Sequence, residues 1–137
     1  MSFQIDELLK KREYDIYNND NICDKKIREI AEIISVDKSI DLKECFDFLK
    51  ASSKFCWFNY LKIIEKLPEE DKIRGFPILF ELLQDYNWPT FQKTIEIFKK
   101  IDKNLVEIYS NKYLAQAQEE DDEEWVSNIQ LLKETIK

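Results

Sequence analysis

Apolar residues recur at steps of three and four along most of this chain, and short polar stretches interrupt the recurrence. This spacing places the apolar side chains on one face of a helix. The clearest example is 77–101, where Pro77 suits a first helical turn, while Pro89 disfavours helical geometry at Trp88 and opens a second helix. The two apolar stripes are Leu79, Leu82 and Leu83, then Phe91, Ile95, Phe98 and Ile101. We therefore predict a helical hairpin at 77–101.

The turn inside this hairpin belongs to a longer motif, P-x-L-x-x-x-L-Q-D-x-N-W-P. Its residues are Pro77, Leu79, Leu83, Gln84, Asp85, Asn87, Trp88 and Pro89. The motif resembles the signature of a family of small bacterial proteins of unknown function that are built from HEAT-like helical hairpins. The resemblance covers the C-terminal half of the chain and implies this fold there. It implies no activity and transfers no functional residues.

The same spacing predicts three more hairpins, at 1–35, 39–67 and 103–136. The stripes of 1–35 are Ile5, Leu8, Leu9 and Ile16, then Ile27, Ile30, Ala31 and Ile34, with Asn21 or Asp24 as the cap of the second helix. Those of 39–67 are Leu42, Cys45, Phe46 and Leu49, then Phe55, Trp57, Leu61, Ile64 and Leu67. Those of 103–136 are Leu105, Ile108, Tyr109 and Tyr113, then Trp125, Ile129, Leu132 and Ile136. The segment 69–76 is a charged linker or a short helical turn.

One glycine and three prolines are too few for a sheet with tight turns, so we predict an all-α protein. A length of 137 residues predicts a single domain, 1–137. Trp57, Trp88 and Trp125 each follow a polar turn and lead into an apolar stripe, at the spacing of roughly 30 to 45 residues that is typical of helical repeats. We expect HEAT-like stacked hairpins, either a short α-solenoid or a compact helical array, with 1–35 as an N-terminal capping hairpin.

Charge and composition exclude several classes of function. The net charge of −7 argues against nucleic acid, because phosphate binding needs clustered Lys and Arg. The chain contains no run of about 18 apolar residues, so we predict no membrane span. Without histidine, and with one glycine, the chain lacks the commonest general base, most zinc sites and glycine-rich phosphate loops, so we predict no catalytic, cofactor or metal residues. Cys23, Cys45 and Cys56 form no C-x-x-C pair, and we expect reduced core thiols in a cytoplasmic protein.

Two acidic turns are the candidate partner-binding site. Its residues are Asp85, Asn87, Glu119, Glu120, Asp121 and Asp122. If corresponding turns of a helical repeat share one edge, these residues and the turn 52–54 lie along it, where the carboxylates attract a basic protein. The alternatives are structural. Asp85 and Asn87 suit turn hydrogen bonds, and 119–124 is also typical of a solvated run whose end at 122–124 complements a helix N-terminus.

The aromatic residues have two interpretations. Tryptophan is enriched in binding hot spots, but the three tryptophans lie in phase with apolar stripes, which favours core packing. We therefore expect Trp88 to be largely buried. Four neighbouring residues cannot all face inward on one helix, so an exposed aromatic patch, if there is one, lies among Phe55, Trp57, Phe58 and Tyr60.

These features predict a non-enzymatic protein–protein interaction module, a monomer or homodimer with a basic protein partner. An immunity protein or antitoxin that masks such a partner is one specific form. The first alternative is a carboxylate-dependent enzyme that uses Glu81 and Asp85, for which a pocket with two carboxyl groups would be the sign. The second is a structural subunit that forms homo-oligomers through its apolar C-terminal helix.

Overall fold

The structure is a computed structural model that describes residues 15–137. Within that range the chain forms seven α-helices and two short 3₁₀-helices, η1 and η2, and contains no strand, which confirms the all-α prediction there. The chain divides into two compact units, Met1–Gly75 and Phe76–Lys137. The single-domain organisation stays a prediction. The predicted helix with Ile5, Leu8 and Leu9 lies outside the described residues, whereas Ile16 is buried.

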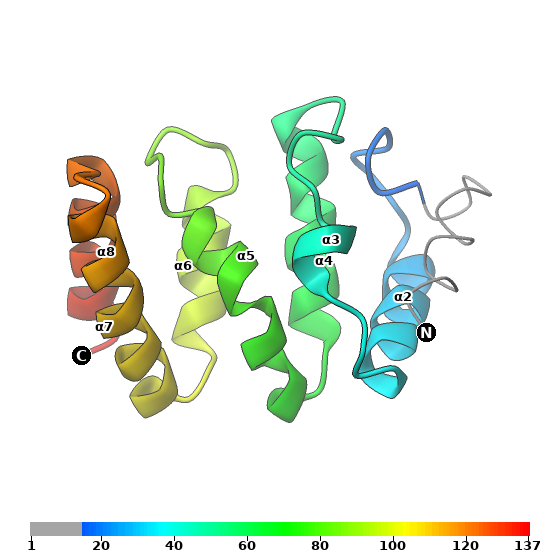
Figure 1. Cartoon of the computed structure of the whole chain (residues 1–137). Helices are drawn as coiled ribbons and strands as arrows, with labels where there is room; N and C mark the ends of the chain where they lie inside the picture. Colours follow the sequence, from blue (N-terminus) through cyan, green and yellow to red (C-terminus); the bar gives the residue numbers. More distant parts are fainter. Residues whose placement is uncertain (1–14) are drawn as a thin grey trace. The chain divides into compact units, whose positions relative to one another are not determined.

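Unit 1 is organised around two helices that lie side by side, α2 (Asp24–Val36) and α4 (Trp57–Lys66) (Figure 1). The described part of the unit also contains α3 (Leu42–Cys45), η1 (Lys54–Cys56) and η2 (Glu69–Gly75). The predicted α2 stripe is confirmed, because Ile27, Ile30, Ala31 and Ile34 are all buried. The predicted cap is wrong. Cys23 occupies the N-cap position, without a side-chain hydrogen bond to the helix.

The helix predicted across 42–49 ends at Cys45, and Leu49 is 95% exposed instead of belonging to a buried stripe. The reason is tertiary. Tyr60 Oη donates to the carbonyl of Asp47 at 2.7 Å and Trp57 Nε1 donates to that of Phe48 at 3.3 Å. The Asp47 carboxylate also accepts the N–H of Leu49 at 2.8 Å. Side-chain partners thus replace the bonds that a continued helix would supply.

An arginine in η2 forms hydrogen bonds with the end of α2 and with the residues that follow it. Arg74 donates to the backbone carbonyls of Ile34, Asp37 and Ile40 at 2.8–3.1 Å. Carbonyls at a helix C-terminus lack partners within the helix, so the guanidinium supplies them. Arg74 also contacts the buried carboxylate of Asp71 at 3.3 Å. Thus 69–76, predicted as a linker or short helical turn, is an ordered helical turn over 69–75.

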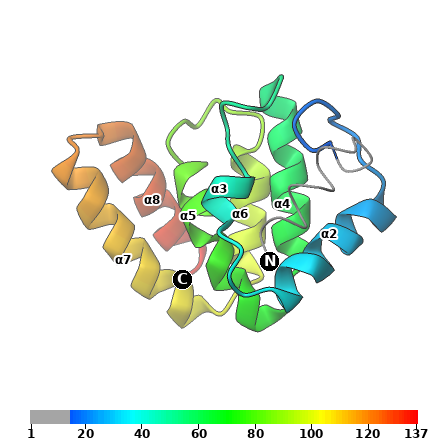
Figure 2. The same cartoon turned by 45° about the vertical axis from the view of Figure 1, so that its right-hand side comes forward.

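Unit 2 consists of α5 (Phe76–Glu81), α6 (Phe91–Lys99), α7 (Lys103–Glu119) and α8 (Glu123–Thr135). Helices α7 and α8 lie side by side and run in opposite directions (Figure 2). Aromatic rings fill the interior: Phe80 stacks on Tyr113 with centroids 4.4 Å apart, and Phe98 lies 4.8 Å from Phe80. The α6 stripe is confirmed, because Phe91, Ile95, Phe98 and Ile101 are all buried.

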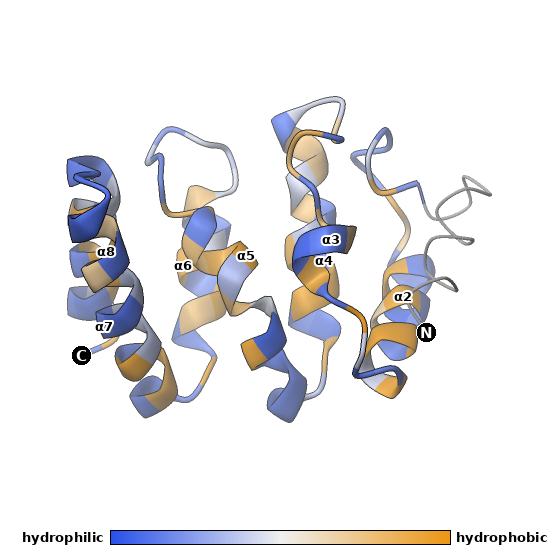
Figure 3. Ribbon diagram, in the orientation of Figure 1, coloured by the Kyte–Doolittle hydropathy of each residue, from blue (hydrophilic) through white to orange (hydrophobic). Residues whose placement is uncertain are grey.

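The stripe predicted for α7 is wrong in part. Its buried residues are Val106, Ser110 and Ala117, whereas Ile108 is 64% exposed. The buried face of α7 is therefore rotated from the predicted one and carries small side chains, which leave room for the aromatic rings. In Figure 3 the ribbons of α7 and α8 contain both hydrophilic and hydrophobic residues.

The three tryptophans do not occupy equivalent positions. Trp57 is the first residue of α4 and Trp125 lies in the first turn of α8, and both are buried. Trp88 precedes α6, which begins at Phe91 and not at Pro89, and its side chain is only partly buried. Trp88 is thus neither fully buried nor exposed, and the prediction that it is largely buried stays a prediction. The predicted aromatic patch is confirmed in part, because Phe55 is 56% exposed while Trp57 and Tyr60 are buried.

The three cysteines are unbridged, in agreement with the prediction of free thiols. Cys45 and Cys56 are buried, but Cys23 is exposed and is not a core residue. None of the described helices is long and apolar enough to cross a membrane.

Candidate acidic site

The turn between α5 and α6 is held by Asp85. Its Oδ1 accepts the N–H of Asn87 at 2.8 Å, and its carbonyl accepts the N–H of Trp88 at 3.1 Å. A carboxylate that bonds to the backbone two residues on forms an Asx turn. The predicted turn role of Asp85 is thus confirmed. The side chain of Asn87 is exposed and that of Asp85 is partly so, which leaves both at the surface of unit 2.

Three hydrogen bonds from α8 hold this turn and the end of α5. Trp125 Nε1 donates to the carbonyl of Phe80 at 2.9 Å, and Asn128 Nδ2 donates to that of Leu83 at 2.7 Å. The backbone N–H of Tyr86 donates to Glu124 Oε2 at 3.1 Å. The first bond gives the Phe80 carbonyl a second partner besides the N–H of Leu83, which lies 3.1 Å from it, and the second gives a partner to the Leu83 carbonyl just beyond the end of α5. The third places the turn 85–87 against the start of α8.

The loop between α7 and α8 is a tight helix-to-helix turn. The N–H of Asp121 bonds to the carbonyl of Gln118 at 3.1 Å, and that of Asp122 bonds to Ala117 at 3.0 Å. Asp121 has φ of 54°, the left-handed conformation in which a glycine is most common. This is a Schellman motif with an aspartate in the glycine position.

The next residues begin α8. Asp122 Oδ1 accepts the N–H of Trp125 at 3.0 Å as the N-cap, and Glu123 and Glu124 lie in the first turn. Negative side chains at a helix N-terminus are stabilising, each by about 0.3–1 kcal/mol. The structural interpretation of 122–124 is therefore confirmed.

Helix capping does not explain the first half of the acidic run. Glu119 and Glu120 lie at the end of α7 and Asp121 follows them, where the helix dipole disfavours negative charge. All three side chains are exposed. The six carboxylates of 119–124 nearly equal the net charge of the whole chain, −7. The other 22 acidic residues nearly balance the 21 Lys and Arg, so the excess negative charge of the chain is about that of this run.

Within unit 2 the structure brings the two predicted acidic turns together. The loops 82–90 and 120–122 lie at the same end of the unit (Figure 1), and the bond between Tyr86 and Glu124 joins them. We use the term acidic edge for Asp85, Asn87, Glu119, Glu120, Asp121 and Asp122. The turn 52–54 belongs to unit 1, and its place along the same edge stays a prediction.

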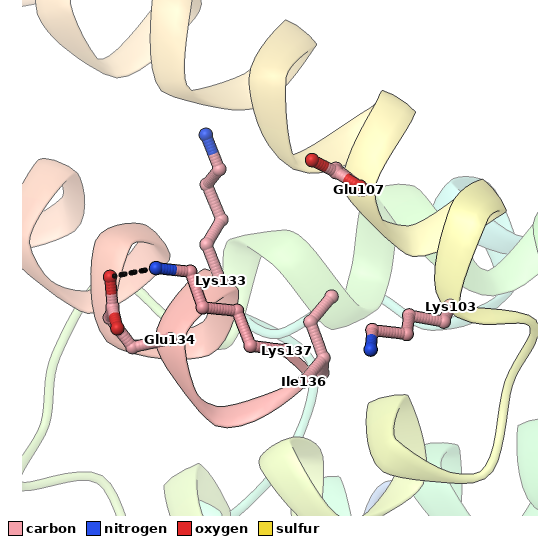
Figure 4. Close-up of a pocket in the computed structure, with 6 residues that line it drawn as sticks. All are labelled: Lys103, Glu107, Lys133, Glu134, Ile136 and Lys137. Atoms are coloured by element: carbon pink, nitrogen blue, oxygen red, sulfur yellow. Dashed lines mark hydrogen bonds and ion pairs between the residues drawn. The ribbon is translucent and has the colours of Figure 1, made fainter.

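Glu81 and Asp85, the candidate catalytic carboxylates, do not line the pocket of unit 2 shown in Figure 4. That pocket has a volume of about 260 Å³. It is lined by Lys103, Glu107, Lys133, Glu134, Ile136 and Lys137. Lys137 pairs with Glu134 at 3.1 Å, and Lys133 donates to Asn111 at 2.6 Å, so charged groups at its rim already have partners. Among residues 15–137, no group of three or more Cys, Asp or Glu side chains is arranged to hold a metal ion.

Sequence reasoning missed the residues that support this site. Glu124 belongs to the predicted solvated run and Trp125 to a predicted apolar stripe, while Asn128 is part of no predicted site. The sequence contains one sign of such a contact, which is an Asn at a buried position of an amphipathic stripe. A buried amide needs a hydrogen-bond partner. Which carbonyl it reaches depends on packing between segments 45 residues apart.

No protein-family model matches this chain, and neither the curated proteins nor the solved structures gave a significant match.

Proposed function

We propose that this chain is a non-enzymatic protein-binding module whose acidic edge binds a basic protein. The observation that carries the proposal is the position of Glu119, Glu120 and Asp121. These exposed carboxylates lie at a helix C-terminus, where they lower stability, and they adjoin a second acidic turn. Charge that lies where it lowers stability favours a role in binding. Its long-range field would also accelerate the encounter with a positive partner.

The fold proposed with this function is an array of HEAT-like hairpins. Two pairs of consecutive helices, α5 with α6 and α7 with α8, match the hairpins predicted at 77–101 and 103–136. The P-x-L-x-x-x-L-Q-D-x-N-W-P motif supports membership of the family that it resembles. Of its residues, Asp85 forms the turn itself, which accounts for an aspartate at that position.

A variant in which four carboxylates of the acidic edge are neutralised, which we call the charge-neutral variant, tests the binding role. Glu119→Gln, Glu120→Gln, Asp121→Asn and Asp122→Asn together remove four negative charges, and Asn can still act as an N-cap and adopt positive φ. Wild type and variant are used as baits for affinity capture from cells that express the protein. We expect the wild type to retain a basic protein that the variant loses. Capture of the same proteins by both baits would contradict the proposal.

Association rates measured with the purified partner distinguish a role of the acidic edge in binding from a role in solubility. If the edge steers association, the variant lowers the association rate, and the wild-type rate falls as the salt concentration rises, since screening shortens the Debye length to about 8 Å at physiological ionic strength. A matched control is Glu96→Gln and Glu107→Gln, which neutralises exposed carboxylates elsewhere in unit 2. Equal rates for wild type and both variants would assign the acidity to solubility alone.

An immunity protein or antitoxin is the specific form that we favour among binding modules. Such a partner is toxic when it is expressed alone and is masked by this chain. Co-expression with the wild type should then restore growth, and co-expression with the charge-neutral variant should not. A captured partner that has no effect on growth would exclude this form while leaving the binding role intact.

A further inference from the structure

Unit 1 presents an exposed apolar loop between α3 and α4. Leu49 is 95% exposed and Phe55 is 56% exposed, although most large apolar side chains of residues 15–137 are buried. The exposed lysines Lys50 and Lys54 flank them. We use the term apolar loop for Leu49, Lys50, Lys54 and Phe55. Exposed apolar side chains next to charge are typical of a protein contact surface.

The backbone of this loop is fixed by hydrogen bonds. The N–H of Ser52 donates to the carbonyl of Tyr17 at 2.7 Å, and the N–H of Phe55 donates to Ser53 Oγ at 3.1 Å. Leu49 is held by its bond to Asp47. Lys50 Nζ lies 5.7 Å from the centre of the Tyr17 ring, within the range of a cation–π contact. Preorganised anchors lose less conformational entropy when they are buried in an interface.

The apolar loop predicts the chemistry of its partner. Two apolar anchors flanked by positive charge fit a surface that has an exposed apolar group flanked by carboxylates. The acidic edge of unit 2 has this composition. Tyr86 is 52% exposed beside it, and the backbone of Tyr86 is bonded to Glu124 at the end of the acidic run. Its ring is supported by Phe91, with centroids 4.8 Å apart.

We propose that the acidic edge also binds a second copy of this chain, which contributes the lysines and apolar side chains of its apolar loop. The proposal rests on the binding role proposed above for the edge. The contact joins two unlike surfaces, Leu49 and Phe55 of one copy meeting Tyr86 of the other while Lys50 and Lys54 meet the carboxylates. Each copy has a net charge of −7, so overall repulsion opposes the local attraction. The association is therefore weak and depends on protein concentration.

Unlike surfaces permit a complementation test with two variants of the full chain. The loop variant is Leu49→Asp with Lys54→Glu, and the edge variant is Glu119→Gln, Glu120→Gln and Asp121→Asn with Tyr86→Ser. Sedimentation equilibrium should show concentration-dependent association of the wild type into dimers and larger species, because a contact between unlike surfaces leaves a free loop and a free edge at its two ends. Each variant alone should associate at least about tenfold more weakly, since each lacks an anchor and its complementary charge. An equimolar mixture should regain dimers, because one variant keeps an intact edge and the other an intact loop.

Several results would overturn the proposal. These are a monomeric wild type at all concentrations, unchanged dimers in either variant, or failure of the mixture to recover association. Ile108→Asp is the matched control, because Ile108 is 64% exposed and belongs to neither surface, and it should dimerise like the wild type. Capture by the loop variant tests the edge independently. If that bait retains a basic protein while the wild type stays monomeric, the proposed function stands and this inference fails.

Discussion

At the scale of single residues, a buried carboxylate in unit 1, that of Asp71, contacts two cations. Lys38 Nζ contacts both carboxylate oxygens at 2.7 Å, and Arg74 contacts Oδ1 at 3.3 Å. The Asp71 side chain is 4% exposed. Hydrogen bonding from Lys38, followed by that from Arg74, holds the pKa of Asp71 below its usual 3.8, against the opposing effect of burial. The charged carboxylate is thus part of the native structure.

This lowered pKa predicts the direction of acid destabilisation. A carboxyl group whose folded pKa lies below its unfolded pKa stabilises the protein fully above the unfolded value, and that contribution is lost as the pH falls through the folded pKa. The free energy of unfolding of the wild type should therefore fall more between about pH 5 and pH 2 than that of Asp71→Asn, measured by urea denaturation. Asp24→Asn is the control, since the ion pair of Asp24 with Arg28 has both side chains about 60% exposed. A wild type and an Asp71→Asn variant with parallel pH profiles would contradict the prediction.

Trp125 and Trp88 should differ in their contributions to stability. Trp125 is 2% exposed and donates to the carbonyl of Phe80, so Trp125→Ala leaves a cavity and removes one of the two hydrogen bonds to that carbonyl, and it should cost about 3–5 kcal/mol. Trp88 is partly exposed, and Trp88→Ala should cost about 1–2 kcal/mol. Denaturation followed by far-UV circular dichroism measures both. Equal losses would show that Trp88 is as well packed as Trp125.

At the scale of elements, the backbone of the loop between α7 and α8 is strained at one residue, and a substitution can relieve this strain. Asp121 has φ of 54° at the position where a helix ends in a Schellman motif. The left-handed conformation costs most residues about 1–2 kcal/mol and aspartate less than that, and glycine avoids this cost. Asp121→Gly should therefore raise the free energy of unfolding by about 0.5–1 kcal/mol, after allowing for the greater freedom of glycine in the unfolded chain.

Glu120→Gly is the matched control for this prediction. Glu120 precedes Asp121 and has φ of −83°, so a glycine there relieves no backbone strain. It only increases the conformational freedom of the backbone at the end of the helix. Glu120→Gly should lower stability by a few tenths of a kcal/mol or more. If both glycine variants were equally destabilised in chemical denaturation, strain at Asp121 would not be the relevant difference between them.

The elements also show which parts of the structure the sequence predicts. Stripes of large apolar side chains predict the buried faces of α2 and α6, because period and burial agree there. The prediction failed on α7, where Ser110 and Ala117 face inward and Ile108 faces outward. It also failed after Cys45, where bonds from Tyr60 and Trp57 to backbone carbonyls replace a helix. In both cases the decisive partners are distant in the sequence, which local periodicity does not report.

The same division between local and long-range contacts holds for the candidate site. The Asx turn at Asp85 and the N-cap at Asp122 depend on neighbours within three residues, and the sequence predicted such roles. The meeting of the two acidic turns depends on the bond between Tyr86 and Glu124, 38 residues apart. The C-terminal carbonyls bound by Arg74 in unit 1 are a similar case, since 34 to 40 residues separate donor and acceptors.

At the scale of the whole molecule, the open question is whether the two units unfold together. The sequence predicts one domain, and the structure contains two compact units of about 75 and 62 residues. A chain of about 60 residues buries only about 60% of its unfolded surface, so a unit of this size is only marginally stable alone. We therefore expect equilibrium unfolding of the full chain to be a single transition.

Single-tryptophan variants can follow each unit separately. Trp57 reports on unit 1 when Trp88 and Trp125 are replaced by Phe, and Trp125 reports on unit 2 when Trp57 and Trp88 are replaced. Because the substitutions themselves change stability, each fluorescence curve is compared with the far-UV circular dichroism of the same variant, which reports on all helices. The single-domain prediction requires the two probes to coincide in both variants. If fluorescence changes at a different urea concentration from the loss of helix, one unit persists after the other has unfolded, and the chain comprises two domains.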